Sequence, residues 1–370
     1  MPESRHEGER KVERHCPHRL TFNMDKPQIP HFMDMAFKRH VETHKAEFVK
    51  IFDSQSIKYK NESIKFEYSY FDYNTKPYYK IMIALYDIDT PYYRNLNRAR
   101  PHNNEASSQR LAKSSESGRF WENIINDHYI RDNVLWIIPY VPNSTKKLWE
   151  LKHFDYLFEK LIQSFKWVKN YSAEYFYLLA NDSSTTAVYN FLPRFSHYFS
   201  GVALIGLKDY DENYANKNTL PSLIVKVKHE KELDLATYLE LNGHIFSYLK
   251  DKSRYLYRPY LRWSQKAGPK QKSYYWLCLT KTNIRHPLEI EATCGSNNDF
   301  VVRCPSLDRI ILLLNLFLVD FCRPVSVMLN NELSFNGMVS ENAHAIGDSL
   351  RRFSDPHLIF SCQLLVKMKK

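Results

Sequence analysis

Residues 174–206, which read EYFYLLANDSSTTAVYNFLPRFSHYFSGVALIG, decide the fold of this chain. Residues 175–179 and 202–207 are short apolar runs of the length of buried strands. Between them, residues 185–199 have the pattern of a helix that is interrupted near Pro193. A buried strand, a helix and a second buried strand predict one unit of a parallel sheet.

The same alternation extends on both sides of this unit. We expect further strands at 56–70, 80–86, 133–139 and 222–227, and helices at 120–128, 154–168 and 233–249. A polar, basic connection covers 87–118. Short apolar strands alternating with helices predict an α/β fold with a doubly wound, mostly parallel sheet.

The pattern changes after residue 265. Strands are expected at 274–279, 288–293, 300–303, 310–316, 325–329 and 358–366, with one helix at 341–352. We therefore divide the chain into an N-terminal extension (1–45), an α/β domain (46–265) and a smaller β-rich C-terminal domain (266–370). The extension is rich in His, Arg and Lys and has little periodicity, so we expect a tail that becomes ordered only against a partner.

Composition limits the kinds of site that the chain can build. It has nine glycines in 370 residues, whereas glycine makes up about 7% of an average protein. Phosphate loops, oxyanion loops and nucleophile elbows use glycine because the backbone there takes a positive φ or closely approaches a ligand. We therefore expect no cofactor. The 52 Lys and Arg exceed the 41 Asp and Glu by 11, which favours an anionic partner such as RNA, an acidic protein or a membrane surface.

Other signals in the chain are weak. The six cysteines form no CxxC pair and do not suggest a disulfide framework. His15, Cys16 and His18 lie together, but in the expected tail, so we predict no metal site. The longest apolar run, Ile310 to Val319, is too short to cross a bilayer and is interrupted by Asn315. With no signal peptide in the N-terminal residues, the chain is expected to be intracellular, cytoplasmic or mitochondrial, without a membrane span.

From 56 to 265 the order of elements is similar to that of α/β-hydrolases of the bacterial esterase, peptidase and polyester-depolymerase kind. The likeness is carried by NVLWIIP at 133–139, EYFYLLA at 174–180, AVYNFLPR at 187–194, FSGVALIG at 199–206 and NGHIF at 242–246. These segments resemble the strand after the oxyanion loop, the strand into the nucleophile elbow, the helix leaving it, the next strand, and the segment with the catalytic histidine. LVDFCRPVSV at 318–327, with Asn330 and FNG at 335–337, resembles a module appended to some of these enzymes.

The resemblance implies a G-x-S-x-G elbow in which small residues flank a serine on a strained turn. The matching residues place Asp182 at the nucleophile position, with Ala180 and Ser184 in place of the two glycines. Ser183 lies one residue out of register. Aspartate serves as the nucleophile in some hydrolases of this fold, so both Asp182 and Ser183 are candidates.

The rest of the implied catalytic site is incomplete. Residues 85–90, LYDIDT, stand where the family has a glycine-containing oxyanion loop, and their two carboxylates oppose a developing negative charge. His244 matches the catalytic histidine, with an inherited packing histidine as the alternative. Glu230, Glu232 and Asp234 lie where the triad acid is expected, and nothing singles one of them out.

Basic residues gather in two stretches that are candidate contacts for RNA or another anion. They are Lys250, Lys252, Arg254, Arg258, Arg262, Lys266, Lys270 and Lys272 in the first stretch and Arg94, Arg98 and Arg100 in the second. Aromatic residues are interleaved in the first stretch: Tyr255, Tyr257, Tyr260, Trp263, Tyr274, Tyr275 and Trp276. They are suited either to stacking on unpaired bases or to packing between the domains.

Three hypotheses about function follow. The first is a catalytically inactive α/β-hydrolase-like protein that serves as a structural or interaction subunit of a larger assembly, binding other proteins and RNA through its basic surface. The second is an active serine-type hydrolase, an esterase or peptidase, with an atypical nucleophile at Asp182 or Ser183. The third is a receptor that binds a small ligand in an enclosed apolar cavity near Asp182 and His244.

Overall fold

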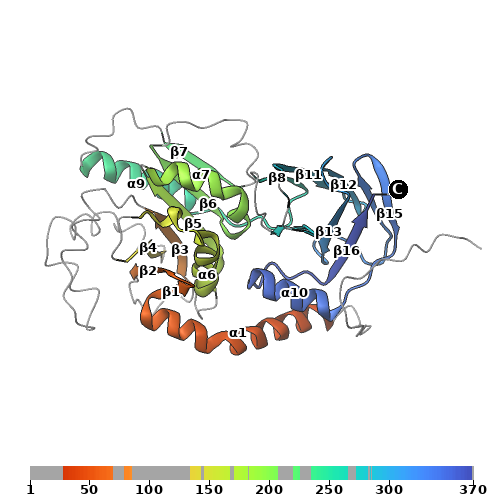
Figure 1. The fold of residues 1–370 in the computed structure, drawn as a ribbon, viewed down its shortest axis with the longest axis horizontal. Coiled ribbons are helices and arrows are strands. Elements are labelled where there is room, and N and C mark those ends of the chain that lie inside the picture. Colours follow the sequence, from red (N-terminus) through yellow and green to blue (C-terminus); the bar gives the residue numbers. More distant parts are fainter. Residues whose placement is uncertain are drawn as a thin grey trace, which may run out of the picture. The chain divides into compact units, whose positions relative to one another are not determined.

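A computed structural model describes residues 28–69, 79–85, 134–142, 146–166, 171–181, 183–206, 220–225, 235–265, 272–281, 284 and 286–368. These residues form two compact units. We call Val41–Tyr255 the α/β unit, and Leu256–Lys370 together with the chain up to His40 the β unit. Figure 1 shows the elements of both.

The α/β unit is built on one mostly parallel sheet of seven strands in the order β1-β2-β4-β3-β5-β6-β7. β2 runs antiparallel to both β1 and β4, and the remaining neighbours are parallel. The strands are β1 (Ser56–Tyr59), β2 (Glu62–Ser69), β3 (Tyr79–Leu85), β4 (Val134–Tyr140), β5 (Tyr171–Asn181), β6 (Gly201–Ile205) and β7 (Ser222–Val225). This arrangement confirms the predicted mostly parallel sheet.

Helices cover both faces of this sheet (Figure 1). α6 (Phe154–Lys166) and α7 (Ser183–Phe195) pack on one face, where Ile81 and Ile83 of β3 point. α9 (Leu235–Leu249) packs on the other face, against Met82 of β3. Successive side chains of a strand point to opposite faces, so a strand buried on both faces reads as a continuous apolar run. This is why the parallel strands could be predicted from their apolar runs.

Polar side chains form hydrogen bonds with backbone groups next to the start of α6 and the end of α9. Glu62 of β2 accepts hydrogen bonds from the backbone N–H groups of Lys152 (2.9 Å) and His153 (2.8 Å), just before α6 begins. Lys80 of β3 donates its Nζ to the carbonyl of Lys250 at 2.9 Å, just after α9 ends. A carboxylate before a helix and a cation after one both complement the helix dipole.

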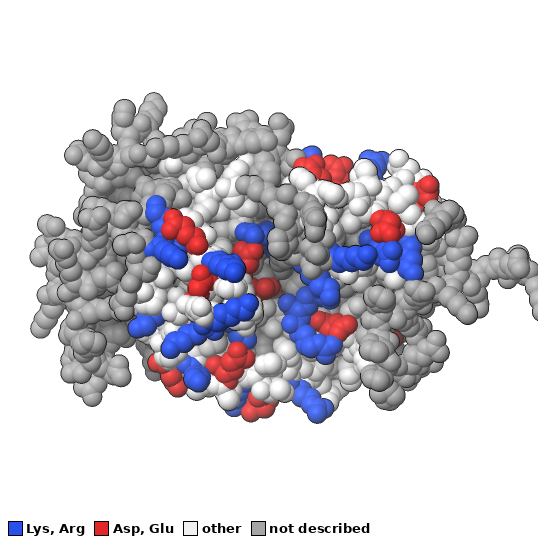
Figure 2. All heavy atoms as spheres, in the orientation of Figure 1, with Lys and Arg blue, Asp and Glu red and all other residues white. Residues whose placement is uncertain are grey.

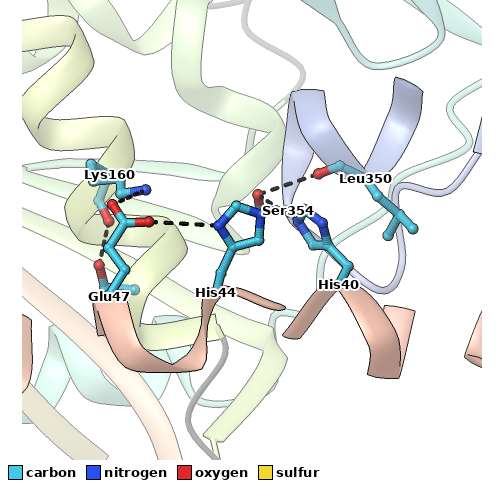
Figure 3. Close-up of polar contacts among 7 residues, drawn as sticks. His40, His44, Glu47, Lys160, Leu350 and Ser354 are labelled. Atoms are coloured by element: carbon cyan, nitrogen blue, oxygen red, sulfur yellow. Dashed lines mark hydrogen bonds and ion pairs between the residues drawn. The ribbon is translucent and has the colours of Figure 1, made fainter. Parts of the chain in front are cut away.

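The second half of α1 (Gln28–Ser54) belongs to the α/β unit, where Phe48 and Ile51 join the core beside α6. Glu47 faces the same helix and pairs with Lys160 at 2.7 Å, while His44 Nδ1 lies 3.6 Å from Glu47 (Figure 3). The apolar contacts are buried and these ion pairs lie at their rim, so the apolar contacts contribute most of the packing energy.

The β unit contains two sheets that share one core. One sheet has the order β15-β14-β12-β11-β8 and the other β16-β13-β10-β9. Their strands are β8 (Tyr260–Gln265), β9 (Ser273–Tyr274), β10 (Leu277–Cys278), β11 (Leu288–Cys294), β12 (Asp299–Arg303), β13 (Arg309–Leu314), β14 (Val325–Leu329), β15 (Glu332–Gly337) and β16 (Cys362–Lys367). Alternate residues of β11, β14 and β16 are buried, as expected for strands whose inner face packs on a second sheet.

Helices add a second cluster to the β unit. Ile346 and Leu350 of α10 (Ala343–Phe353) and Ile359 pack against Phe32 and Phe37 of the first half of α1. At the end of α10, Ser354 takes the left-handed conformation (φ 47°) and its hydroxyl lies 3.4 Å from His40 Nε2 (Figure 3). The first half of α1 is therefore a structural part of this unit.

Two expectations about organisation differ from the structure. The prediction of a tail was wrong for residues 28–45, which are helical because their apolar side chains pack within the two units. In the sequence, the boundary between the compact units falls at Tyr255/Leu256 rather than at 265/266, because β8 pairs with β11 along its whole length. None of the helices among the described residues is long and apolar enough to span a membrane.

Candidate functional site

The candidate site lies at the carboxyl end of β5, in the middle of the parallel sheet. β5 ends at Asn181 and α7 begins at Ser183, so Asp182 alone separates the strand from the helix. A strand that passes at once into a helix is the setting of a nucleophile elbow. Asp182 and the side chain of Ser183 lie outside the described part of the chain.

Ser184 occupies the place of the second elbow glycine and has a structural contact. Its side chain is fully buried, and its hydroxyl donates a hydrogen bond of 2.7 Å to the carbonyl oxygen of Leu85, the last residue of β3. Leu85 pairs with Ala180, which is buried at the place of the first glycine. The α7 N-terminus is thus tied to the end of β3, the strand that precedes the oxyanion loop in the hydrolases that the sequence resembles.

His244 lies within α9 and its side chain is exposed. The residues that α9 buries against the sheet are its neighbour Ile245 and Leu249. An exposed histidine in the body of a helix cannot line an enclosed cavity, so the receptor hypothesis loses one of its two residues. The expected triad acids, Glu230, Glu232 and Asp234, and residues 86–90 of the expected oxyanion loop lie outside the described residues.

The structure brings together a serine and a histidine that the sequence did not suggest. Ser354 and His40 are more than 300 residues apart in the chain, and their side-chain atoms lie 3.4 Å apart in the β unit (Figure 3). The Ser354 hydroxyl also lies 3.3 Å from the carbonyl of Leu350, where it can donate its proton. This contact closes the end of α10. The backbone N–H of Ser354 also donates to the Leu350 carbonyl at 2.9 Å, so we assign Ser354 a capping role.

Four of the five described thiols are poorly suited to act as nucleophiles, and the fifth, Cys322, is exposed. Cys278, Cys304 and Cys362 are buried, as expected for ordinary core cysteines. Burial and the nearby Asp299 raise the pKa of Cys294 to about 11, which keeps this thiol protonated at neutral pH. Groups of three or more His, Cys, Asp or Glu that could hold a metal ion are absent from the described residues. His15, Cys16 and His18 lie outside them.

The predicted basic stretch is divided between the two units. Lys250, Lys252 and Arg254 lie in the α/β unit and are half-buried. Lys252 Nζ lies 5.0 Å from the centre of the Tyr248 ring, and Arg254 donates to the carbonyl of His197 at 3.3 Å. These contacts give two of the three residues a structural role within their own unit.

Arg258, Arg262 and Lys272 lie in the β unit. Arg262 lies 3.3 Å from Glu291 on the neighbouring strand β11, whereas Lys272 is exposed. Figure 2 shows Lys and Arg side chains interspersed with Asp and Glu on the face drawn. The other candidates, Lys266, Lys270, Arg94, Arg98 and Arg100, are not among the described residues.

The aromatic residues of the stretch include buried and exposed members. Trp263, Tyr274, Tyr275 and Trp276 are buried in the core of the β unit, where the rings of Trp263 and Tyr274 are stacked 5.3 Å apart. They are inaccessible to a ligand. Tyr255 and Tyr260, in contrast, are about half exposed (56% and 46%). Of these residues, only the exposed tyrosines could stack on bases.

Comparisons with known proteins give a limited result. No protein-family model and no curated protein matches the sequence. Among solved structures, the chain is similar to one titled "Crystal Structure of a Thermostable Esterase", with a TM-score of 0.37 and 9% identity. The matched part covers 54% of this chain and 62% of that one, so the chain spans less than two thirds of the esterase. The structure is a mixed α/β fold with one large, mostly parallel sheet and two further β-sheets.

Proposed function

We propose that this chain is a catalytically inactive relative of the α/β-hydrolases that serves as a structural or interaction subunit of a larger assembly, in the cytoplasm or a mitochondrion. The observation that carries the proposal is the buried hydrogen bond from Ser184 to Leu85. It places a structural tie where a hydrolase keeps a glycine so that the nucleophile turn stays free of side chains.

The strand order supports the architectural part of this proposal. An antiparallel start, β1-β2-β4, followed by the parallel strands β3-β5-β6-β7, is the order of the central sheet in α/β-hydrolases. β5, which leads to the candidate elbow, lies inside the sheet between β3 and β6. This position of β5 supports the proposal that the candidate site corresponds to a hydrolase active site whose residues have changed.

A second candidate function is an active hydrolase with an atypical nucleophile. The direct passage from β5 through Asp182 into α7 favours it, because such a turn presents a side chain at the sheet edge. The exposed position of His244 on α9 counts against it, since a general base must reach the nucleophile by a hydrogen bond of about 3 Å.

We further propose RNA as one partner of the assembly subunit. The support is the net charge of +11 and the exposed Lys272, since cationic groups bind phosphates and release counterions. A nucleic-acid contact of this kind weakens steeply as salt is raised, which separates it from an apolar protein contact.

Sedimentation of the tagged full-length chain from its own cells tests the subunit proposal. We expect the chain to sediment with an assembly much larger than its own 44.1 kDa, and to leave that position after ribonuclease treatment. Sedimentation at the position of a free 44.1 kDa protein before any treatment would contradict the proposal.

A further inference from the structure

A turn in the β unit holds two large apolar side chains in solvent. After β13 ends at Leu314, Leu316 is 42% exposed and Phe317 is 71% exposed, the largest value among the exposed large hydrophobic residues described. Exposing apolar area to water costs free energy. Single exposed apolar residues are common on proteins, so the surroundings of this turn decide whether it has a function.

The turn is rigid. Asn315 is buried, donates its side-chain amide to the carbonyl of Ile359 at 3.0 Å, and accepts the backbone N–H of Phe317 at 3.1 Å. The backbone N–H groups of Leu318 and Val319 both bond to the Asn315 carbonyl at 3.0 Å. Phe317 is thus held outside the core by a buried polar side chain, and its exposure is a property of the folded unit.

Tyr257 supports one side of the Phe317 ring. The two rings are stacked, with centroids 4.8 Å apart and planes inclined by 16°. The Tyr257 hydroxyl donates to the carbonyl of His357 at 2.6 Å, so the supporting ring is itself fixed. A fixed aromatic ring with one supported face and high exposure is prepared to receive a flat partner at little cost in side-chain entropy.

The net charge of the last third of the chain favours a nucleic acid as the flat partner. Residues 256–370 carry 15 Lys and Arg against nine Asp and Glu. Lys272, one of the predicted anion contacts, lies in the same unit and is exposed. Proteins that bind single strands without reading sequence combine stacking aromatic side chains with a positively charged surface.

We infer that Phe317, supported by Tyr257, is a stacking platform for an unpaired base of single-stranded RNA, with exposed basic side chains of the same unit, such as Lys272, as phosphate contacts. The inference rests on the proposed RNA contact and adds the residue that receives a base. Sequence preference is expected to be slight, because every base offers an aromatic face.

Fluorescence anisotropy with labelled oligouridylate and oligoadenylate of about 10 nucleotides tests this inference on the full chain. Phe317→Ala is expected to weaken binding by a factor of about 5 to 100, and Phe317→Leu should weaken it nearly as much. Phe317→Trp should keep wild-type affinity, and its fluorescence should be quenched by the bound RNA. Met338→Ala, which truncates another exposed apolar residue (58%), is the matched control and should bind as the wild type does.

The salt dependence of binding separates stacking from charge. Phe317→Ala should leave the slope of log Kd against log salt unchanged, whereas Lys272→Ala should reduce it by about 0.7. If the wild type binds RNA and Phe317→Ala binds equally well, the platform inference fails while the RNA contact stands. If the wild type binds no RNA at low salt, both the RNA contact and the platform are contradicted.

Discussion

The hydroxyl of Ser184 joins the start of α7 to the end of β3. In the proposed comparison with α/β-hydrolases, this end of the parallel strands corresponds to the active site. The Ser184 side chain is fully buried and donates to a carbonyl at the end of β3. A buried carbonyl that loses a hydrogen-bond donor costs about 1–3 kcal/mol. This hydrogen bond explains why a serine stands at position 184 without any catalytic role.

Ser184→Ala is predicted to lower the free energy of unfolding by about 1–2 kcal/mol, because it leaves the Leu85 carbonyl without this donor. Chemical denaturation measures the effect. Thr186→Ala, on the exposed side of the same helix, is the control and should change the stability by less than about 0.5 kcal/mol. Equal stability of Ser184→Ala and the wild type would show that the tie contributes nothing.

At the scale of elements, Glu62 links β2 to the start of α6. Burial acts to raise the pKa of Glu62, but the backbone N–H groups of His153 and Lys152 and the His153 ring (3.0 Å) hold this pKa below its ordinary value. A folded-state pKa below the unfolded value means that the ionised carboxylate stabilises the fold. That stabilisation is complete above about pH 4.5 and is lost as the pH falls through the folded-state value.

Glu62→Gln is accordingly predicted to cost about 0.5–1 kcal/mol at pH 7, the lower part of the range for helix caps, because solvent reaches the carboxylate. The difference from the wild type should shrink below about pH 4, where the wild-type carboxylate takes up its proton. Thermal unfolding across pH 3–7 measures both, with the exposed Glu42→Gln as the control. If the stability difference between Glu62→Gln and the wild type grows toward acid pH, the ionised carboxylate of Glu62 is not the form that stabilises the fold.

The elements that could be predicted from the sequence are those that are buried on both faces. β4 and β6 are continuous apolar runs, β3 and β5 contain such runs at 81–85 and 175–180, and burial explains these runs. β15 was not predicted because none of its residues is fully buried, so no apolar pattern marks it. The run 310–316 was predicted as one strand, whereas β13 ends at Leu314 because Asn315 turns inward to bond the Ile359 carbonyl.

The candidate site was only partly predictable for a similar reason. The order of strands and helices placed the β5–α7 connection correctly, since that order follows from hydrophobic pattern. The roles of its side chains depend on contacts across the sheet, such as Ser184 with Leu85, which no local pattern encodes. His244 was singled out by its neighbours in the sequence, and only the fold shows that its side chain is exposed.

At the scale of the whole molecule, α1 contributes to both compact units, with Gln28–His40 in the β unit and Val41–Ser54 in the α/β unit. The predicted extension, residues 1–45, is rich in His, Arg and Lys, which led to the expectation of a tail. Phe32, Met33, Ala36 and Phe37 repeat at helical spacing, and they pack on α10 and Ile359. The N-terminal region thus completes a core that is formed mostly by the last third of the chain.

Phe37→Ala in the full chain is predicted to destabilise the β unit by about 1–3 kcal/mol, since it uncovers Ile346, Leu350 and Ile359. Met35→Ala on the same helix is the matched control, because Met35 is 53% exposed and should be neutral. Hydrogen exchange of the α10 amides localises the effect. If the α10 amides keep their protection in Phe37→Ala, then α1 does not stabilise this core.

The central claim, that the β5–α7 connection is structural rather than catalytic, is tested most directly by hydrolysis of short p-nitrophenyl esters by the full chain, combined with labelling by a fluorophosphonate. The account predicts no saturable turnover above the rate with serum albumin and no labelled peptide that contains Ser183. Saturable turnover that Ser183→Ala or Asp182→Asn abolishes, and that His244→Ala also abolishes, would contradict the claim and establish an active hydrolase.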